Sequence, residues 1–429
     1  MKDSLATEWH PNLWPPFTQI TSSQPPERVL KGNGALLIKD DGTSIIDAIS
    51  SWWVTLHGHG NKYIAEAIYH QAQELEQVIF ADFTHPQAEL LAKRLSKATG
   101  LERLFFSDNG STAVEVAIKL ALQWWHNQGE ERQHIIAFEG AYHGDTFGAM
   151  SVGERNLFNE PFEKLLFPVS RVLWPSTWWN DPGIDEREEK AIRQLETLLE
   201  VPTAAVILEP LVQGAGGMAM VRTEFLEKIE KIVHQSKTLL IADEVMVGFG
   251  RTGALFASQR GKLSPDLMCL SKGLTGGFLP MGITMASKKI FDVFLDSNPR
   301  KTFWHGHSFT ANPLGCAAAN ASLDLLEDNS NSYLNFESRH SPHLKQLALH
   351  PKVKKVRLAG TIAAFELNTN EEAGYLNITG KAIKKYALRH NVFIRPLGNV
   401  IYLLPPLCIT DEQLTHCYTT LQNGLDIIK

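Results

Sequence analysis

Short apolar runs alternate with helical stretches through the middle of this 429-residue chain, and this alternation restricts the fold more than any other feature. The runs are "RLFFSD", "HIIAFEG", "AAVILEP", "TLLIADE" and "LMCLSKG", and stretches such as "STAVEVAIKLALQWW" and "TEFLEKIEKIVHQS" lie between them. Strands that alternate with helices build βαβ units, because parallel neighbours need a long crossover connection. The pattern therefore predicts an α/β fold with a mostly parallel sheet.

The pattern changes after about residue 320, where the strands are typical of a smaller α+β unit: "VKKVRLAGTIAAFELN", "VFIRPLG" and "NVIYLLPPL". Thr410 with Gln413 three residues later is a capping-box signature that marks the start of the last helix. Near the other end, "GALLIKDDGTSIIDAIS" is typical of strands around a turn. We therefore expect a large α/β domain over 56–320 and a small α+β domain over 1–55 and 321–429.

The composition is that of a soluble globular protein, with 44% hydrophobic and 21% charged residues. A formal net charge of −6 and the absence of a long basic run argue against nucleic acid or an anionic membrane as partner. We see no signal peptide, and no apolar run reaches the roughly 18 residues of a membrane helix. Four scattered cysteines without a C-x-x-C pair favour the cytoplasm.

Two charged residues, Asp243 and Lys272, each follow an apolar run. At the carboxyl edge of a parallel sheet, where such folds bind ligands, they would lie close together. Lost hydration lowers the pKa of a lysine there and makes its amine a usable nucleophile. Pyridoxal phosphate needs both a lysine for the Schiff base and an acid for its ring nitrogen. Alone, Asp243 is equally explained as a turn residue, and Lys272 as a surface lysine.

A phosphate site is indicated by "FFSDNGSTAVEVAIK", in which a polar loop containing Gly110 leads into a helix. Thr112 and Glu115 have capping-box spacing, and free N–H groups at the helix start, with the Ser111 hydroxyl, would bind an anion. Simple capping is an equally good explanation of these residues. Tyr142 follows the next apolar run and could stack on a flat cofactor ring, although a core tyrosine is commoner.

Three further residues could contact a substrate. Arg395 lies between two apolar runs and needs a counter-charge, which either a protein acid or a substrate carboxylate would supply. Trp52 and Trp53 precede "HGHG" and are either core residues or the wall of a pocket for a long apolar substrate.

Two motifs suggest other functions. "GFGRTG", from Gly248 to Gly253, matches the dinucleotide-binding fingerprint, so a nicotinamide dehydrogenase is an alternative. The glycines lie beyond the strand end, however, and the segment after them is too short for the expected helix. "HGH" occurs twice, but without a third ligand at a recognisable spacing we expect no metal site.

Taken together, these residues resemble the class III aminotransferases, pyridoxal-phosphate enzymes of fold type I. The resemblance extends over nearly the whole chain and includes the blocks "DNGSTAVEVAIKLALQ", "AYHGDTFGAMSV", "LEPLVQGAGGM", "IADEVMVGFGRTG", "LSKGLTGG" and "FWHGHSFTANPLG". The blocks "SSWW", "YHGDTFGAMSV" and "VQGAGGM" resemble the branch that aminates a long keto acid in biotin synthesis.

The resemblance implies roles for individual residues. Lys272 would form the Schiff base and move the proton, and Asp243 would pair with the ring nitrogen. The other implied contacts are with the ring (Tyr142), with the phosphate (Gly110, Ser111 and, across a homodimer interface, His307 and Ser308) and with the keto acid (Phe17, Trp52, Trp53, Tyr142, Gly306 and Arg395). The implied reaction is a ping-pong transamination.

Three departures from the family pattern matter, two for the substrate and one for the phosphate segment. Met246 stands where ornithine- and GABA-type relatives commonly have glutamine, which argues against those activities. His307 and Ser308 replace a common Pro-Thr and keep the hydroxyl. Phe17 stands where many relatives have tyrosine, so the donor stays open between adenosylmethionine and lysine. A broad ω-amine or diamine aminotransferase of the same fold is the nearest alternative.

Overall fold

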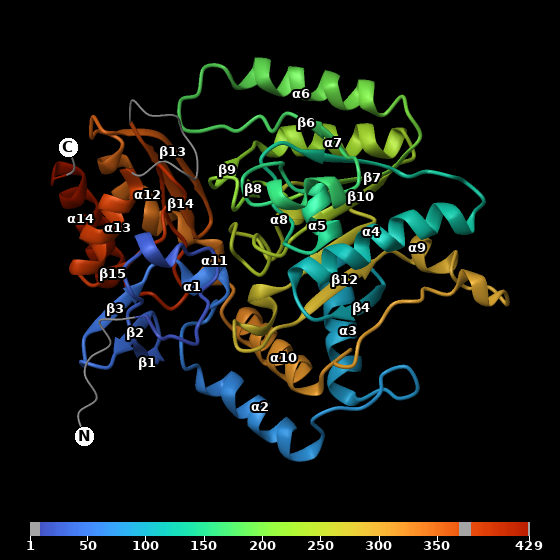
Figure 1. The fold of residues 1–429 in the computed structure, drawn as a ribbon, viewed down its shortest axis with the longest axis horizontal. Coiled ribbons are helices and arrows are strands. Elements are labelled where there is room, and N and C mark those ends of the chain that lie inside the picture. Colours follow the sequence, from blue (N-terminus) through green and yellow to red (C-terminus); the bar gives the residue numbers. More distant parts are fainter. Residues whose placement is uncertain (1–8, 369–378, 428–429) are drawn as a thin grey trace.

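A computed structural model describes residues 9–368 and 379–427. A seven-stranded sheet lies at its centre, in the order β4-β12-β11-β10-β7-β5-β6 (Figure 1). Its strands are β4 (Arg103–Ser107), β5 (His134–Phe138), β6 (Ser170–Val172), β7 (Thr203–Leu208), β10 (Leu239–Asp243), β11 (Leu267–Leu270) and β12 (Gly282–Ala286). The strands predicted from the five apolar runs are all present, and together with the comparisons below they confirm the α/β class.

The sheet is parallel except at β12, which pairs antiparallel with both β11 and β4. The β10–β11 register sets Asp243 beside Cys269, so both strands end at the same edge. Because β11 ends at Leu270, Lys272 follows that edge by two residues. The chain order alone did not show that β12 would lie between β4 and β11.

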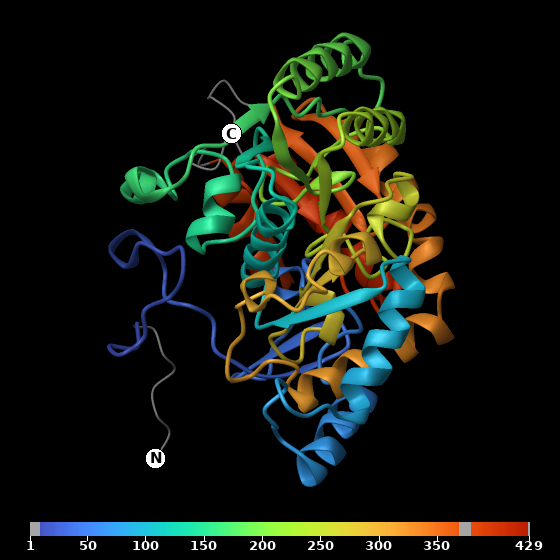
Figure 2. The same cartoon turned by 90° about the vertical axis from the view of Figure 1, so that its right-hand side faces the viewer.

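Helices cover both faces of the sheet (Figures 1 and 2). Side chains alternate between the faces of a strand, so Leu239 and Ile241 of β10 pack with helix α4 (Gly110–Asn127), whereas Leu240 packs with α7 (Thr223–Gln235). This burial on both faces explains why the strands read as continuous apolar runs.

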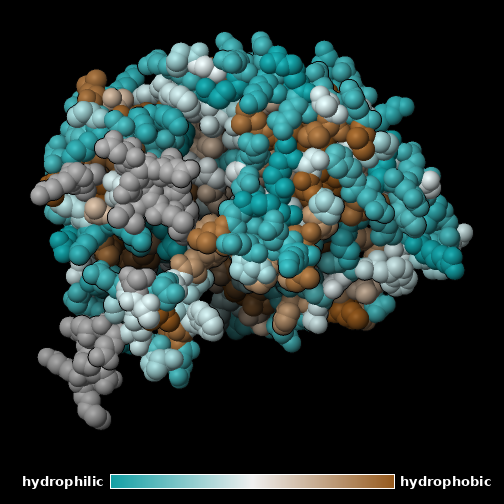
Figure 3. All heavy atoms as spheres, turned by 45° about the horizontal axis from the view of Figure 1, so that its top comes forward, coloured by the Kyte–Doolittle hydropathy of each residue, from teal (hydrophilic) through white to brown (hydrophobic). Residues whose placement is uncertain are grey.

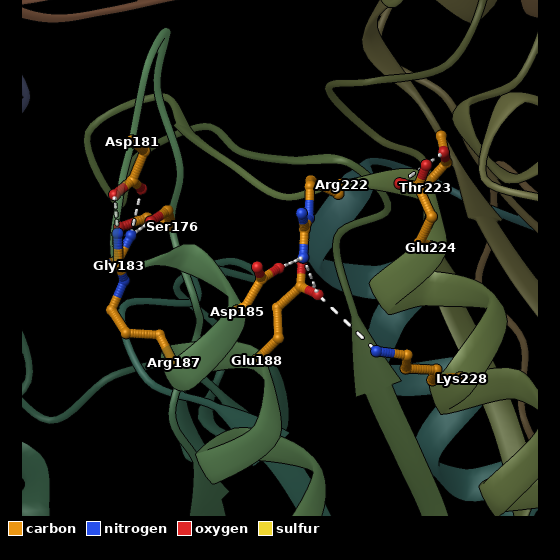
Figure 4. Close-up of polar contacts among 10 residues, drawn as sticks. All are labelled: Ser176, Asp181, Gly183, Asp185, Arg187, Glu188, Arg222, Thr223, Glu224 and Lys228. Carbon is orange, nitrogen blue, oxygen red and sulfur yellow. Dashed lines mark hydrogen bonds and ion pairs between the residues drawn. The ribbon is translucent and has the colours of Figure 1, made fainter.

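The helices α6 (Ile184–Leu198) and α7 are joined by a polar cluster on the outer side of the sheet (Figure 4). Arg222, at the start of α7, donates to both oxygens of Glu188 at 2.8 and 2.6 Å and to Asp185 at 2.6 Å. Since Glu188 is 1% exposed, this paired contact satisfies a carboxylate that burial would otherwise destabilise.

Both ends of the chain contribute to a second region. Strands β1 (Val29–Asn33), β2 (Leu36–Lys39) and β3 (Ser44–Asp47) form a sheet with β15 (Val392–Phe393), and β13 (Val353–Ala359), β14 (Ile362–Leu367) and β16 (Val400–Leu403) form another. The predicted capping box at the last helix is confirmed, because Thr410 and Gln413 exchange hydrogen bonds of 3.0 and 3.1 Å. The domain boundaries themselves stay a prediction; helix α10 (Pro313–Asp328) runs through the one at 320.

The other helices are α1 (Ser50–Trp53), α2 (Lys62–Glu74), α3 (Pro86–Thr99), α5 (Phe147–Val152), α8 (Ala257–Arg260), α9 (Lys288–Asp292), α11 (Asn331–Leu334), α12 (Phe336–Leu347), α13 (Thr379–Arg389) and α14 (Asp411–Ile427), and β8 (Val212–Gln213) pairs with β9 (Ala219–Met220). The face in Figure 3 is mostly hydrophilic with scattered apolar residues. Within the described ranges, no helix has both the length and the apolar character to span a bilayer.

Candidate active site

A cavity of about 420 Å³ opens at the carboxyl edge of the central sheet. It is lined by residues from several strand ends and loops, among them six of the predicted site residues: Trp53, Gly110, Ser111, Tyr142, Asp243 and Lys272. The structure thus brings together the residues predicted for a cofactor ring, its phosphate and its Schiff base. The remaining predicted residues lie outside this lining.

Asp243 lies at the end of β10 and is 3% exposed. One of its carboxylate oxygens accepts a hydrogen bond from the backbone N–H of Val245 at 3.0 Å, and the other lies 2.7 Å from Nδ1 of His143. His143 is equally buried, and its Nε2 has no hydrogen-bond partner among the described residues. A buried carboxylate fixed in this way, beside an open cavity, suits a ligand that carries a protonated ring nitrogen.

Lys272 reaches the cavity just past the end of β11, and its backbone adopts a left-handed φ of 48°. Its Nζ lies 4.7 Å from the centroid of the Trp53 ring. Burial lowers the pKa of Lys272 to about 8, although Asp243 and Glu209 act to raise it. At neutral pH a lysine of this kind therefore has a far larger neutral, nucleophilic fraction than a surface lysine.

Glu209 also lines the cavity, and the sequence analysis did not select it. Its two oxygens accept the backbone N–H groups of Tyr142 (3.2 Å) and Gly214 (2.9 Å). Burial raises the pKa of Glu209 to about 7. A sequence signal did exist, because Glu209 directly follows the apolar run "AAVIL" that forms β7, at the same sheet edge as Asp243. His143 had a weaker signal, its position next to Tyr142.

The start of α4 has the features of an anion site. Asn109 caps the helix by accepting from the N–H of Thr112 at 3.0 Å, while the amides of Gly110 and Ser111 donate to no acceptor in the described part of the chain. Two free N–H groups at the positive end of an 18-residue helix attract a phosphate.

Close packing leaves no room for larger residues around this helix start. A Cβ atom on Gly144 would overlap the Ser111 side chain, and one on Gly110 would come within 2.7 Å of Val245. The glycines therefore keep the backbone open beside the Ser111 hydroxyl, which accepts from the N–H of Asp145 at 3.2 Å.

The expected capping box between Thr112 and Glu115 is wrong. The box pairs Asn109 with Thr112, one helical turn earlier, because the helix begins at Gly110. Glu115 instead accepts the N–H groups of Gly148 and Ala149 at the start of α5, at 2.6 and 3.1 Å.

Tyr142 is 37% exposed and lines the cavity between Glu209 and the start of α4. Burial raises the pKa of its hydroxyl, with Asp145 and Asp243 acting in the same direction. The side chain therefore stays protonated and offers a ring face to a flat ligand.

Four side chains that contact one another in a row, Arg395, Trp52, Phe17 and Phe158, lie outside the cavity lining. The guanidinium of Arg395 lies 4.6 Å from the Trp52 ring, and Phe17 packs edge-on against Trp52 at 5.5 Å and against Phe158 at 5.8 Å. No carboxylate within 9–368 or 379–427 forms an ion pair with Arg395. Within these ranges, the described contact of the Arg395 guanidinium is therefore with an aromatic ring and not with a protein acid.

The segment that contains Gly306, His307 and Ser308 does not contribute to the cavity lining of the same chain. A Cβ on Gly306 would meet no atom within 4 Å. His307 lies 3.2 Å from Asp108, and the carbonyl of Ser308 accepts from Gln77 at 2.7 Å. In one chain, His307 thus lies next to the residue that precedes the cap of α4, but no residue of this segment lines the cavity.

The two motifs that suggested a dinucleotide site and a metal site form a loop and contacts within the protein. The loop "GFGRTG" leads into α8, which has four residues, so it does not open the long helix of a dinucleotide fold. The histidines of both "HGH" segments contact protein groups. His57 lies 3.0 Å from Ser322 and His59 lies 2.8 Å from Asp47. His305 lies 2.9 Å from Lys119, and His307 is next to Asp108.

The aminotransferase class-III family matches residues 19–425, and the chain belongs to this family. The adenosylmethionine-8-amino-7-oxononanoate aminotransferase of Synechococcus elongatus is 55% identical, with 98% of this chain and 99% of the relative covered. The protein of the same name from Geobacter sulfurreducens is 40% identical, with 97% and 96% covered.

Solved structures of aminotransferases also resemble this chain over almost its whole length. The adenosylmethionine-8-amino-7-oxononanoate aminotransferase of Methanocaldococcus jannaschii superimposes with a TM-score of 0.90 at 33% identity, with 97% of each chain covered. An amine transaminase from an uncultivated Pseudomonas species, in its PLP-bound form, gives 0.91 at 29% identity, covering 98% of this chain and 99% of the other. These matches confirm fold type I.

Proposed function

We propose that this class III aminotransferase aminates the 7-keto group of 8-amino-7-oxononanoate to give 7,8-diaminononanoate in biotin synthesis. The names of the two relatives, which align over almost their whole length, support this substrate. The observation that carries the chemistry is the meeting of Lys272, Asp243 and the free amides of α4 around one cavity.

The cofactor we propose is pyridoxal phosphate, as in the PLP-bound transaminase that shares this fold. The described side chains fit it. The paired carboxylate of Asp243 would hold the ring nitrogen in its protonated form, and Tyr142 would cover the ring. Gly110 and Ser111 would bind the phosphate, because their amides lack protein acceptors.

The chain's own groups supply the proton movements. The cofactor, when bound, supplies an electron sink for negative charge on the substrate carbon. With a pKa of about 8, Nζ of Lys272 can act as a neutral nucleophile and then take up and return a proton. Asp243 keeps its position through Val245 and His143, so its carboxylate would give a protonated ring nitrogen a fixed partner. We propose a ping-pong transamination, in which the keto product of the donor leaves before the keto acid binds, so that the same groups serve both half-reactions.

The stacked row at Trp52 supports the proposed acceptor. Arg395 forms no ion pair with a carboxylate of the described residues, and its planar guanidinium can bind a substrate carboxylate with two hydrogen bonds. Trp52 and Phe17 would line an apolar chain between that carboxylate and Lys272. We propose adenosylmethionine as the amino donor. Lysine remains the alternative donor, because Phe17 lacks the hydroxyl that many relatives have in the substrate pocket.

We further propose a cytoplasmic homodimer with active sites at its interface. Large apolar side chains are exposed on segments that project from one side of the molecule in Figure 2, where the N-terminal segment lies near the loop around Phe158. They include Leu13, Trp14, Leu157, Phe162 and Leu165. A partner covering them would bring His307 and Ser308 of one chain toward the phosphate site of the other. All four cysteines are free thiols, as is usual in the cytoplasm.

The test is the absorbance spectrum of the purified protein with each donor in a separate cuvette, followed by addition of 8-amino-7-oxononanoate. The proposal predicts a visible cofactor band that one donor bleaches and the keto acid restores. A band that simple amines and diamines also bleach rapidly would instead favour the broad ω-amine aminotransferase, which the amine transaminase neighbour supports. If no band forms even with added pyridoxal phosphate, the proposal is wrong.

A further inference from the structure

The loop "GFGRTG" contains a buried arginine whose role the proposed function does not explain. Arg251 is 1% exposed, and no carboxylate in the described ranges forms an ion pair with it. Its guanidinium donates to two backbone carbonyls from distant parts of the chain, Pro405 at 2.9 Å and Trp53 at 3.4 Å. Burial of a cation among carbonyls is costly, and it lowers the pKa of Arg251 to about 9, although the charge of Asp47 acts to raise it.

The glycines of the loop are what place this arginine. Gly250 and Gly253 have φ values of 90° and 84°, which side chains rarely adopt. A Cβ at Gly250 would also come within 2.7 Å of Tyr333. The backbone carbonyl of Arg251 accepts from the N–H of Thr361 at 2.8 Å, so the residue is fixed from both ends.

The segment that Arg251 contacts is strained. Ser50, Ser51 and Trp53 have φ values of 52°, 61° and 67°, and left-handed backbone costs about 1–2 kcal/mol per residue unless its surroundings hold it. The carbonyl of Leu404 accepts from the Ser50 hydroxyl at 2.8 Å, which fixes the start of the segment.

The other end of the segment is held at Trp53. Its indole Nε1 donates to the Tyr402 hydroxyl at 3.0 Å, and its carbonyl is the acceptor for Arg251. The Trp53 ring then lies 4.7 Å from Nζ of Lys272. Arg251 therefore contacts Trp53, which in turn contacts the Lys272 amine that carries the proposed chemistry.

We propose that Arg251 is a positioning residue: it holds the strained segment Ser50–Trp53 so that the Trp53 ring lies against the amine of Lys272. An arginine suits this task because its planar fork reaches two carbonyls at once, whereas a lysine ammonium is a single point on a flexible stem. The buried cation also acts on the amine directly, as a minor contribution. Burial is the main cause of the low pKa of Lys272; Asp243 and Glu209 oppose it, and Arg251, the smallest of the four causes, adds to it.

The inference rests on the proposed function, and the test uses the cofactor-loaded enzyme with two spectral measurements. The first is the pH midpoint of the visible band, which reports the proton on the Lys272 nitrogen. The second is the rate at which the donor bleaches that band. Without the Arg251 cation the proton is held more tightly, so Arg251→Met should raise the midpoint by roughly a few tenths of a pH unit. Both Arg251→Met and Arg251→Lys should slow bleaching about tenfold or more.

Arg357 supplies a control. It is 6% exposed and likewise donates to backbone carbonyls, of Met218 at 2.8 Å and Gly217 at 2.6 Å, neither of which lines the cavity. It differs from Arg251 in a further contact with Glu366 at 3.5 Å. Arg357→Met and Arg357→Lys should lower thermal stability but leave the midpoint and the bleaching rate unchanged. Equal effects of the Arg357 and Arg251 substitutions would overturn the inference, since loss of any buried arginine would then suffice.

A double substitution keeps the test decisive if Arg251→Met does not fold. Because Arg251 acts through Trp53, adding Trp53→Leu to Arg251→Lys should slow bleaching by less than about twofold further. If the two substitutions instead slow bleaching independently, so that their factors multiply in the double variant, the inference is overturned. Absence of a visible band in the wild-type protein would instead refute the proposed function, so the two failures are distinguishable.

Discussion

Replacing Lys272 by methionine should abolish transamination and at the same time stabilise the cofactor-free protein at neutral pH. The pKa of Lys272 falls from its ordinary 10.5 to about 8 on folding, mainly through burial. One pKa unit corresponds to about 1.36 kcal/mol, so the difference of about 2.5 units sets an upper limit of about 3 kcal/mol. Since the amine still faces the cavity, we expect about 2 kcal/mol.

The sign follows from proton binding. Between pH 8 and 10.5 the folded wild-type protein binds fewer protons at Lys272 than the unfolded chain, so its free energy of unfolding rises with pH in this window. Below pH 8 the full cost of the buried charge is present. Methionine has a similar length and no charge, so the advantage of Lys272→Met should be largest near pH 7 and vanish toward pH 10.5.

The assay is urea unfolding of the two full-length, cofactor-free proteins at several pH values, followed by far-UV circular dichroism. Lys272→Ala serves as a second inactive variant that should not gain stability, because it leaves a cavity. If Lys272→Met is no more stable than wild type near pH 7, or if its advantage is independent of pH, the reasoning about a destabilised amine is refuted.

Asp243→Asn should weaken cofactor retention by roughly 10- to 100-fold, because a charge-assisted hydrogen bond of about 1.5–3 kcal/mol is lost; fluorescence titration measures this, and unchanged affinity would contradict the role of Asp243. Arg395→Ala should raise KM for the keto acid by roughly tenfold or more and change kcat less, with partial recovery in Arg395→Lys; steady-state kinetics decide, and an effect on kcat alone would exclude carboxylate binding. Phe17→Tyr should alter the ratio of rates with adenosylmethionine and lysine by about an order of magnitude while leaving the visible band unchanged; an unaltered ratio would remove Phe17 from donor selection.

Local patterns in the sequence were sufficient for the strands and for the central pair of residues. Short continuous apolar runs are typical of strands that are buried on both faces, and one of them ends at Asp243 and another two residues before Lys272. Since parallel neighbours end at one edge, the meeting of these side chains followed from the pattern. The capping box at Thr410 is likewise a local signal, and it was confirmed.

Contacts between distant segments could not be read in this way. The pairing of His143 with Asp243 depends on β5 lying two strands from β10, and the sheet order does not follow the chain order. The burial of Arg251 depends on carbonyls from residues 53 and 405, which no local pattern connects. The capping box at Thr112 failed for a different reason, because two overlapping motifs competed and Asn109 caps the helix better.

The central claim is that Lys272 is the residue that bonds the cofactor, and one measurement tests it most directly. The loaded wild-type enzyme is reduced with borohydride, digested, and analysed by peptide mass spectrometry. We predict one pyridoxyl group per chain, on the peptide that contains Lys272, and none when the amino donor has first bleached the band. A label on another lysine, or a reduced protein without a label at Lys272, would contradict the account.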